Sequence, residues 1–307
     1  MQNNWFIIVN PKSGSGKGLK QWQKKVKKAL DKADMSYEMA FTEQPAHAIE
    51  LTMKAIAAGH RRLVAMGGDG TIHEVMNGIL AQKNVKSTDI SLSIIPVGTG
   101  NDWIKTLKIP ADIDKAIDII INGRHYLQDV GRAVYHEGKE QRERYFLNVG
   151  GTGFDAYVAR KLDTKTDKTG KKIYLLELLK GIMGYKNIPM SLTSKAKDIK
   201  EDFFTINVSI CKYFGSGMKI APHAIPDDGF FDITLIKNIS KWGVIKELRN
   251  LYNGSFLKNP HIETFKAKQV SVASTDDIYL QLDGELLGHG PFEFHIVPLS
   301  LKVMVAP

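Results

Sequence analysis

Short apolar runs alternate with helical patterns over roughly the first 130 residues of the chain. Three of these runs, at residues 5–9, 63–66 and 92–95, each lead into a glycine-rich loop, and a helical pattern follows each loop. Short, wholly apolar strands that alternate with helices are typical of a parallel sheet covered on both faces. Ligands of such sheets bind at the carboxyl ends of the strands, where these loops would lie. We therefore expect an N-terminal α/β domain with a parallel sheet.

The clearest helical pattern follows the second glycine loop. Its apolar residues, from Ile72 to Leu80, recur at the spacing of one helix face. Thr71 and Glu74 have the spacing of a capping box. The pattern predicts a helix with Thr71 at its N-cap and one face buried against the sheet.

After about residue 130 the pattern changes, and few helices separate the apolar runs. One helical pattern interrupts them at 172–184, and its apolar side chains fit either core packing or an interfacial lid that touches lipid. Such a succession of strands indicates antiparallel β structure. The last strands, 292–306, could complete either domain. The other predicted strands cover 145–149, 203–214, 230–237, 269–273 and 278–282.

Length and composition exclude several classes of protein. The 307 residues are enough for two domains of ordinary size. A single cysteine, Cys211, excludes a disulfide framework and argues against a cysteine zinc site. The sequence has neither a signal-peptide pattern nor an apolar run long enough to cross a membrane. It therefore predicts a soluble, cytoplasmic protein.

The net charge of +9 identifies no partner by itself. Basic residues concentrate at 20–32 and 160–172, where they form either solvated faces or a patch that faces an anionic membrane. The sequence has no aromatic RNA-binding signature, so we expect no nucleic acid partner.

The three glycine loops are candidates for phosphate binding, because glycine lets main-chain N–H groups approach an anion closely. The first loop, at 14–18, fits neither the Walker A spacing nor the dinucleotide fingerprint. In the second, Asp69 lies between glycines. An acid there indicates a Mg²⁺-nucleotide unless it satisfies N–H groups of the turn. In the third, Asn101 and Asp102 either add polar ligands or cap the next helix.

The ordered motifs resemble those of a known family. NPKSGSGKG, GGDGTIHEVMNG and PVGTGND occur in the first half, and NVGGTGFDA, APHAIPDDGFFD and LDGE follow. In this order they resemble the diacylglycerol kinase catalytic-domain family, and within it the soluble bacterial lipid kinases related to sphingosine kinases. The resemblance implies a nucleotide-binding α/β domain at 1–129, to which 292–307 return. It also implies a β-rich, sandwich-like lipid-substrate domain at 130–291.

The same resemblance implies the residues of the site. The general base would be Glu285. A second, structural Mg²⁺ would be held by the carboxylate of Asp228 and the carbonyl oxygens of Ile225 and Phe230. The residues that would bind ATP are Asn10, Pro11, Lys12, Ser13, Gly14, Thr42, Gly67, Gly68, Asp69, Gly70, Thr71, Ile72, His73 and Thr99.

Residue chemistry supports these roles independently. Asp283-Gly284 is a strong signal for a tight hairpin, which alone would make the LDGE motif structural. A kinase that phosphorylates an alcohol also needs a group that accepts the hydroxyl proton. Its other requirements are the positioning of the reactants and the neutralisation of the phosphate charge. The catalytic residues Asp69, acting with Mg²⁺, and Glu285 meet these needs together with the loop N–H groups. Supporting partners would be Asn101, Asp102 and Asp129.

The sequence therefore predicts an ATP- and Mg²⁺-dependent lipid kinase. The favoured reaction transfers the γ-phosphate of ATP to diacylglycerol and gives phosphatidic acid, at the anionic inner face of the membrane. Two alternatives stay open: a kinase of a soluble acceptor such as NAD, and a non-catalytic regulator that binds a nucleotide or another anion. A homodimer is compatible with the sequence.

Overall fold

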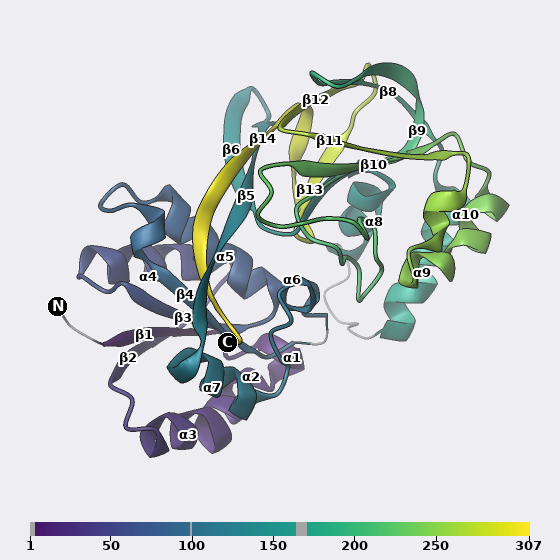
Figure 1. Ribbon diagram of the computed structural model, residues 1–307. Helices are drawn as coiled ribbons and strands as arrows, with labels where there is room; N and C mark the ends of the chain where they lie inside the picture. The colour runs from purple at the N-terminus through teal and green to yellow at the C-terminus, as the bar shows by residue number, and fades with distance from the viewer. Residues whose placement is uncertain (1–3, 99, 164–170) are drawn as a thin grey trace. The chain divides into compact units, whose positions relative to one another are not determined.

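The computed structural model describes residues 4–98, 100–163 and 171–307 (Figure 1). Thr99 and part of the basic stretch 160–172 lie outside the described residues. The chain divides into two compact units: unit 1 comprises Met1–Asp129 and Pro298–Pro307, and unit 2 comprises Val130–Val297. Strands β5 (Arg124–Glu137) and β14 (Glu285–Val305) contribute residues to both units.

Unit 1 is built around a sheet of parallel strands. The order is β14-β4-β3-β1-β2, and the pairs between these neighbours are parallel. Helices α4 and α5 cover one face of the sheet, and α3 and α7 cover the other (Figure 1). The apolar strand residues are buried from both sides, as a two-sided covering requires. The bounds are β1 (Trp5–Val9), β2 (Tyr37–Phe41), β3 (Arg62–Gly67), β4 (Ser91–Pro96), α3 (Lys27–Lys32), α4 (His47–Ala57), α5 (Asp69–Ala81) and α7 (Ile113–Asn122).

Helix α5 begins three residues earlier than the capping box predicted. Gly68 is its N-cap, and no side chain caps it. The Thr71 hydroxyl accepts a hydrogen bond from Asn10 Nδ2 at 3.0 Å. The Glu74 carboxylate accepts hydrogen bonds from the main-chain N–H groups of Ala46 and Ala48 at 2.9 and 3.0 Å. The predicted capping box is therefore wrong, because both of its polar side chains bind neighbouring segments instead.

Unit 2 is rich in antiparallel β structure, as predicted. Its strands follow the order β11-β10-β9-β7-β13-β14, while β12 pairs with both β14 and β8. The predicted strand 203–214 is wrong at its end, because β9 stops at Ser209 and turns follow. The bounds are β6 (Glu140–Phe146), β7 (Val149–Gly153), β8 (Ile188–Thr193), β9 (Asp198–Ser209), β10 (Phe231–Lys237), β11 (Ile262–Ala267), β12 (Gln269–Ala273), β13 (Tyr279–Leu282), α8 (Phe154–Asp163), α9 (Lys171–Gly184) and α10 (Lys241–Glu247).

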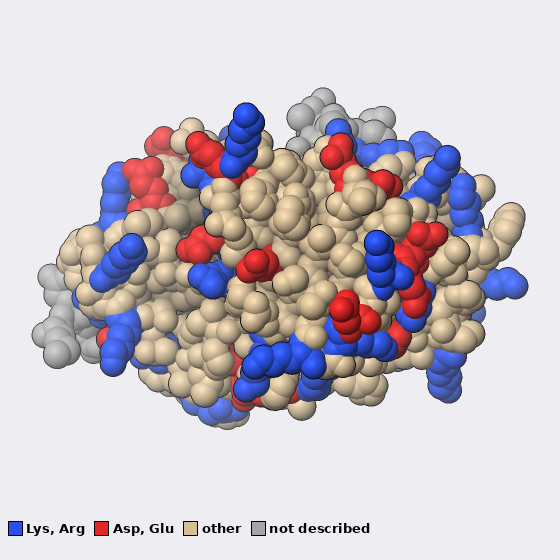
Figure 2. Space-filling model, turned by 90° about the horizontal axis from the view of Figure 1, so that it is seen from above, with Lys and Arg blue, Asp and Glu red and all other residues tan. Residues whose placement is uncertain are grey.

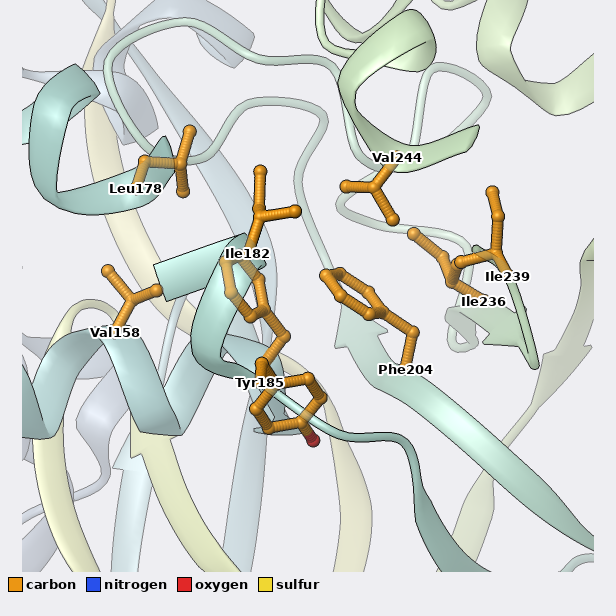
Figure 3. Packing of buried hydrophobic residues seen from close by; sticks show 9 residues of the cluster. Val158, Leu178, Ile182, Tyr185, Phe204, Ile236, Ile239 and Val244 are labelled. Carbon is orange, nitrogen blue, oxygen red and sulfur yellow. The ribbon is translucent and has the colours of Figure 1, made fainter. Parts of the chain in front are cut away.

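Helices α8, α9 and α10 pack on this β structure through one apolar cluster. Figure 3 shows Leu178 and Ile182 of α9 and Val244 of α10 in the cluster around Phe204 of β9. Core packing, one of the two options for the helix at 172–184, therefore holds for Leu178 and Ile182. Among the described residues, no helix is both long enough and apolar enough to span a bilayer.

Candidate functional site

The first glycine loop is fastened to the start of α5. Asn10, directly after β1, donates from Nδ2 to the Thr71 hydroxyl at 3.0 Å, and its Oδ1 accepts from the main-chain N–H of Lys12 at 3.0 Å. The Ser13 hydroxyl donates to the Asn10 carbonyl oxygen at 2.8 Å. One asparagine therefore fixes both the turn that follows β1 and the distance from this loop to the second one.

Two glycines allow this loop its path. Gly14 has a φ of 60°, a conformation that favours glycine. A Cβ atom on Gly18 would lie 2.2 Å from the Asn10 carbonyl oxygen. The Lys12 and Lys17 side chains are exposed. The loop therefore combines a tightly packed backbone with two cationic side chains that can reach an anion.

The second loop leads from β3 into α5 without a spacer. A Cβ atom on Gly67 would lie 2.3 Å from the Thr71 hydroxyl oxygen, so only glycine fits there. Gly70 is exposed in the first turn of the helix. A helix N-terminus presents its first main-chain N–H groups to an anion, and its dipole favours negative charge there. This loop has the backbone geometry of a phosphate site.

Asp69 connects the second loop to the third. Its carboxylate accepts hydrogen bonds from the main-chain N–H groups of Asp102 and Trp103 at 3.1 and 3.4 Å, at the start of α6 (Asp102–Thr106). Asp69 therefore satisfies main-chain N–H groups of another segment, whereas the alternative that the sequence left open concerned those of its own turn. Each carboxylate oxygen has two lone pairs, so accepting a hydrogen bond does not by itself prevent an oxygen from binding a cation.

The third loop places an amide oxygen close to Gly68 of the second loop. The oxygen Oδ1 of Asn101 is buried and has no hydrogen-bond partner in the described structure. Cβ atoms built on Gly68 and Gly98 would lie 4.0 and 2.7 Å from it. Carboxylate and amide oxygens are ligands that Mg²⁺ accepts. The side-chain oxygens of Asp69 and Asn101 are therefore the donors of these loops that could hold a magnesium ion arriving with a nucleotide.

Several other residues predicted to bind ATP have side chains that are too buried to contact it. Ile72 and His73 are fully buried in α5, and Thr42, after β2, is 8% exposed. The main-chain N–H of Thr42 donates to the Val9 carbonyl oxygen at 2.9 Å, which puts Thr42 beside the start of the first loop. Thr99 lies outside the described residues. Contacts from Ile72 and His73 to a nucleotide would have to come from the main chain.

The LDGE motif of unit 2 forms the predicted tight hairpin. Asp283 and Gly284 have φ values of 51° and 93°, and Leu282 pairs with Glu285 across the turn. The Asp283 carboxylate accepts hydrogen bonds from three consecutive main-chain N–H groups, those of residues 147 to 149, at 2.9, 2.9 and 3.1 Å. The turn is therefore anchored to the start of β7, and Glu285 is the first residue of a fixed strand.

Glu285 forms an ion pair that its sequence context did not reveal. Its carboxylate lies 3.3 Å from Arg144 on β6, and the Glu285 side chain is 32% exposed. The two residues are 141 positions apart, so no local pattern links them. Arg144 can hold the carboxylate in one orientation while part of it stays accessible.

At the predicted second metal site, the carboxylate of Asp228 lies beside the ammonium group of Lys266. The Asp228 carboxylate accepts from the main-chain N–H of Phe230 at 3.0 Å and forms an ion pair with Lys266. Lys266 also lies 3.5 Å from Asp232. Across the described residues, no group of three or more His, Cys, Asp or Glu could hold a metal ion. The Mg²⁺ site of Asp228 and the carbonyl oxygens of Ile225 and Phe230 stays a prediction, and we derive no step from it.

A buried carboxyl beside β7 has no counterpart among the predicted site residues. The oxygen Oδ2 of Asp155, on α8, is buried without a hydrogen-bond partner in the described structure. A Cβ atom on Gly151 would lie 3.0 Å from this oxygen and 3.0 Å from Asn207 Oδ1, which is also unpaired there. Burial raises the pKa of Asp155 to about 7, although hydrogen bonds with Thr205 and Asn207 oppose the rise.

This carboxyl should make stability depend on pH. The pKa of Asp155 is higher in the folded than in the unfolded chain. The contribution of its protonated carboxyl group to the free energy of unfolding is therefore complete below about pH 4 and is lost as the pH rises through about 7. We expect Asp155→Asn to match the parent below pH 4 and to exceed its free energy of unfolding by about 2–4 kcal/mol at pH 8. Urea unfolding across this range measures the difference. Asp202→Asn, an exposed site on β9, is the control, and equal pH slopes for parent and Asp155→Asn would contradict the prediction.

Comparisons with known proteins cover both units. The sequence profile described as "Diacylglycerol kinase catalytic domain" matches residues 4–133, and that described as "YegS C-terminal NAD kinase beta sandwich-like domain" matches residues 148–305. A Bacillus subtilis protein named as a lipid kinase, YtlR, is 30% identical over 98% of this chain and 99% of its own length. The chain belongs to the diacylglycerol kinase catalytic-domain family. The resemblance inferred from the motifs is confirmed.

Other members of the family agree. The diacylglycerol kinase of Staphylococcus saprophyticus is 30% identical over 98% of this chain and 94% of its own length. A solved structure of a Bacillus anthracis protein named as a diacylglycerol kinase matches with a TM-score of 0.79 at 23% identity, over 99% of this chain and 97% of that one, and supports the fold. Membership makes the protein a kinase-type enzyme, which implies that it uses ATP.

Proposed function

We propose that the protein is a lipid kinase that transfers the γ-phosphate of Mg²⁺-ATP to the hydroxyl group of diacylglycerol. One observation carries the proposal most directly. Three glycine loops at strand ends of one sheet are joined by the Asn10–Thr71 hydrogen bond and by the hydrogen bonds of Asp69 to α6. Glycine-rich loops beside a helix N-terminus suit a chain of phosphates.

In this proposal the first and second loops bind the phosphates of ATP. In the first loop the contacts would come from the Lys12 side chain and the main-chain N–H of Gly14, because the N–H groups of Asn10, Lys12 and Ser13 bond within the protein. In the second loop they would come from Gly67–Thr71. Mg²⁺ bound with the nucleotide would neutralise phosphate charge. Asp69 and Asn101 are the residues that would hold it. Phosphoryl transfer depends mainly on such positioning and charge stabilisation, so rigid loops are what the chemistry requires.

Glu285 is assigned the role of general base. It accepts the proton of the lipid hydroxyl, and the hydroxyl oxygen forms a bond to the γ-phosphorus. The bond from this phosphorus to the β,γ-bridging oxygen breaks, and ADP leaves. Arg144 is a positioning residue, since it contacts the carboxylate of Glu285 at 3.3 Å. The names of the relatives, which include several diacylglycerol kinases, support diacylglycerol as the proposed acceptor.

Phosphate transfer from labelled ATP to mixed micelles tests the proposal. Each micelle preparation carries one acceptor: diacylglycerol, a monoacylglycerol, an isoprenoid alcohol or a sphingoid base. NAD in free solution serves as the soluble alternative. We expect Mg²⁺-dependent transfer to diacylglycerol. Transfer to NAD alone would replace the proposal with a soluble-acceptor kinase. Nucleotide binding without transfer to any acceptor would favour a regulator.

Asp69→Asn separates the two contributions of this residue. An asparagine keeps an oxygen that can accept from the Asp102 N–H but lacks the charge that attracts a metal ion. We expect the thermal unfolding of the variant to stay close to that of the parent, while the Mg²⁺ concentration for half-maximal activity rises about tenfold. An unchanged Mg²⁺ requirement would remove Asp69 from metal binding. A loss of thermal stability would show that the capping of α6 needs the full carboxylate.

A further inference from the structure

Two large apolar side chains project from neighbouring elements of unit 2. Trp242, the second residue of α10, is 70% exposed, and Met183, near the end of α9, is 52% exposed. Lys241 donates a hydrogen bond to the Met183 carbonyl oxygen, which joins the two elements directly. Their neighbours Ile182 and Val244 lie in the core cluster instead (Figure 3). We call the exposed surface of residues 180–186 and 241–249 the α9–α10 tip.

The exposure of Trp242 differs from that of the other tryptophans. Trp5, Trp22 and Trp103 are 7%, 6% and 0% exposed. A single exposed apolar residue needs no explanation. Here a tryptophan and a methionine lie on elements in direct contact, and both are outside the core. The tip therefore offers an apolar point that the described chain does not cover.

The charged side chains of the α9–α10 tip are mostly basic. Five exposed basic residues lie on the tip, and Glu247 is the only acidic residue of the sequence within these two ranges. Glu247 accepts hydrogen bonds from the side chains of Asn250 and Asn259. On the face that Figure 2 presents, by contrast, acidic and basic side chains are interspersed. The basic residues of the tip are Lys180, Lys186, Lys241, Lys246 and Arg249.

We infer that the α9–α10 tip docks on the surface of an anionic phospholipid bilayer, with Trp242 and Met183 entering the interface. Tryptophan is enriched at membrane interfaces, because its ring is apolar and its N–H prefers a polar partner. Basic residues near an anionic leaflet add attraction that salt weakens. The inference rests on the proposed function, since a kinase of membrane lipids must reach them at the bilayer.

Tryptophan fluorescence can test the inference on the full-length protein, because Trp242 is the exposed member of the four. Vesicles contain either phosphatidylcholine alone or 30% phosphatidylglycerol in phosphatidylcholine. With the anionic vesicles we expect a blue shift of the emission, protection from acrylamide quenching and co-sedimentation. These effects should weaken in high salt. An equal response to both vesicle types would overturn the electrostatic part of the inference.

Substitutions then assign the effect to the tip. We expect Trp242→Ala to weaken binding to the anionic vesicles about tenfold and Trp242→Phe to retain most of it. Both variants should unfold at the parent temperature, because the side chain is exposed. Vesicle binding of Trp242→Ala equal to that of the parent would overturn the inference. A separate assay tests the proposed function, because a dispersed short-chain diacylglycerol can be phosphorylated without docking on a membrane. The parent and Trp242→Ala should phosphorylate it equally. Vesicle binding without phosphate transfer to any lipid would contradict the proposed function but would still support the docking inference.

Discussion

Glu285→Gln is expected to lower kcat about 1,000-fold while the KM for ATP changes less than twofold. Glutamine keeps the shape of the side chain and an oxygen that can accept a hydrogen bond from Arg144, which lies 3.3 Å from Glu285. It cannot take up the proton of a lipid hydroxyl. A variant that binds ATP normally and transfers phosphate poorly is what loss of a general base produces. Steady-state kinetics with micellar diacylglycerol, together with nucleotide binding by calorimetry, measure both quantities.

Glu143→Gln provides a matched control in the same unit. Glu143 lies on β6, and its carboxylate is 3.4 Å from Arg132, so it resembles the Glu285–Arg144 pair in chemistry. Its side chain is 54% exposed, and the substitution changes the net charge equally. We expect kcat within twofold of the parent. A Glu285→Gln enzyme with more than a tenth of the parental kcat would exclude Glu285 as the general base.

Local signals in the sequence predict those parts of the site that neighbouring residues determine. Glycines after apolar runs indicate the three loops, since only glycine tolerates contacts such as that of Gly67 with Thr71. Asp283-Gly284 indicates the tight turn, because both positions require positive φ. In each case the requirement lies within a few residues along the chain, so a single sequence contains it.

Local sequence signals do not predict contacts between segments that are distant along the chain. The spacing of Thr71 and Glu74 fits a capping box, yet both side chains bind segments that lie at least 26 residues away along the chain. Arg144 has no feature that links it to Glu285. Strands β8 and β11 escaped prediction because exposed and half-buried positions interrupt their apolar pattern. The pKa of Asp155 depends on burial by α8, β7 and β9 together, which only the folded chain defines.

Asp283→Ala is expected to lower the free energy of unfolding by about 3–5 kcal/mol. Three main-chain N–H groups, from residues 147 to 149, lose their acceptor, and these residues are at most 6% exposed. Each buried N–H left without a partner costs about 1–3 kcal/mol, and partial access of water reduces the sum. Alanine also tolerates the φ of 51° less well than aspartate does. Thermal unfolding should shift downward by about 10 °C.

Asp283→Asn and Asp277→Ala determine whether the three hydrogen bonds are the cause. Asparagine accepts positive φ and keeps one oxygen acceptor, so we expect a loss of only about 1–2 kcal/mol. Asp277 is exposed, and its replacement by alanine removes the same charge; its unfolding should match that of the parent. Kinase activity links the turn to the chemistry: with Glu285 two residues beyond Asp283, Asp283→Ala should lose activity even at temperatures where it stays folded. Full activity in a folded Asp283→Ala protein would mean that the anchored turn does not set the position of Glu285.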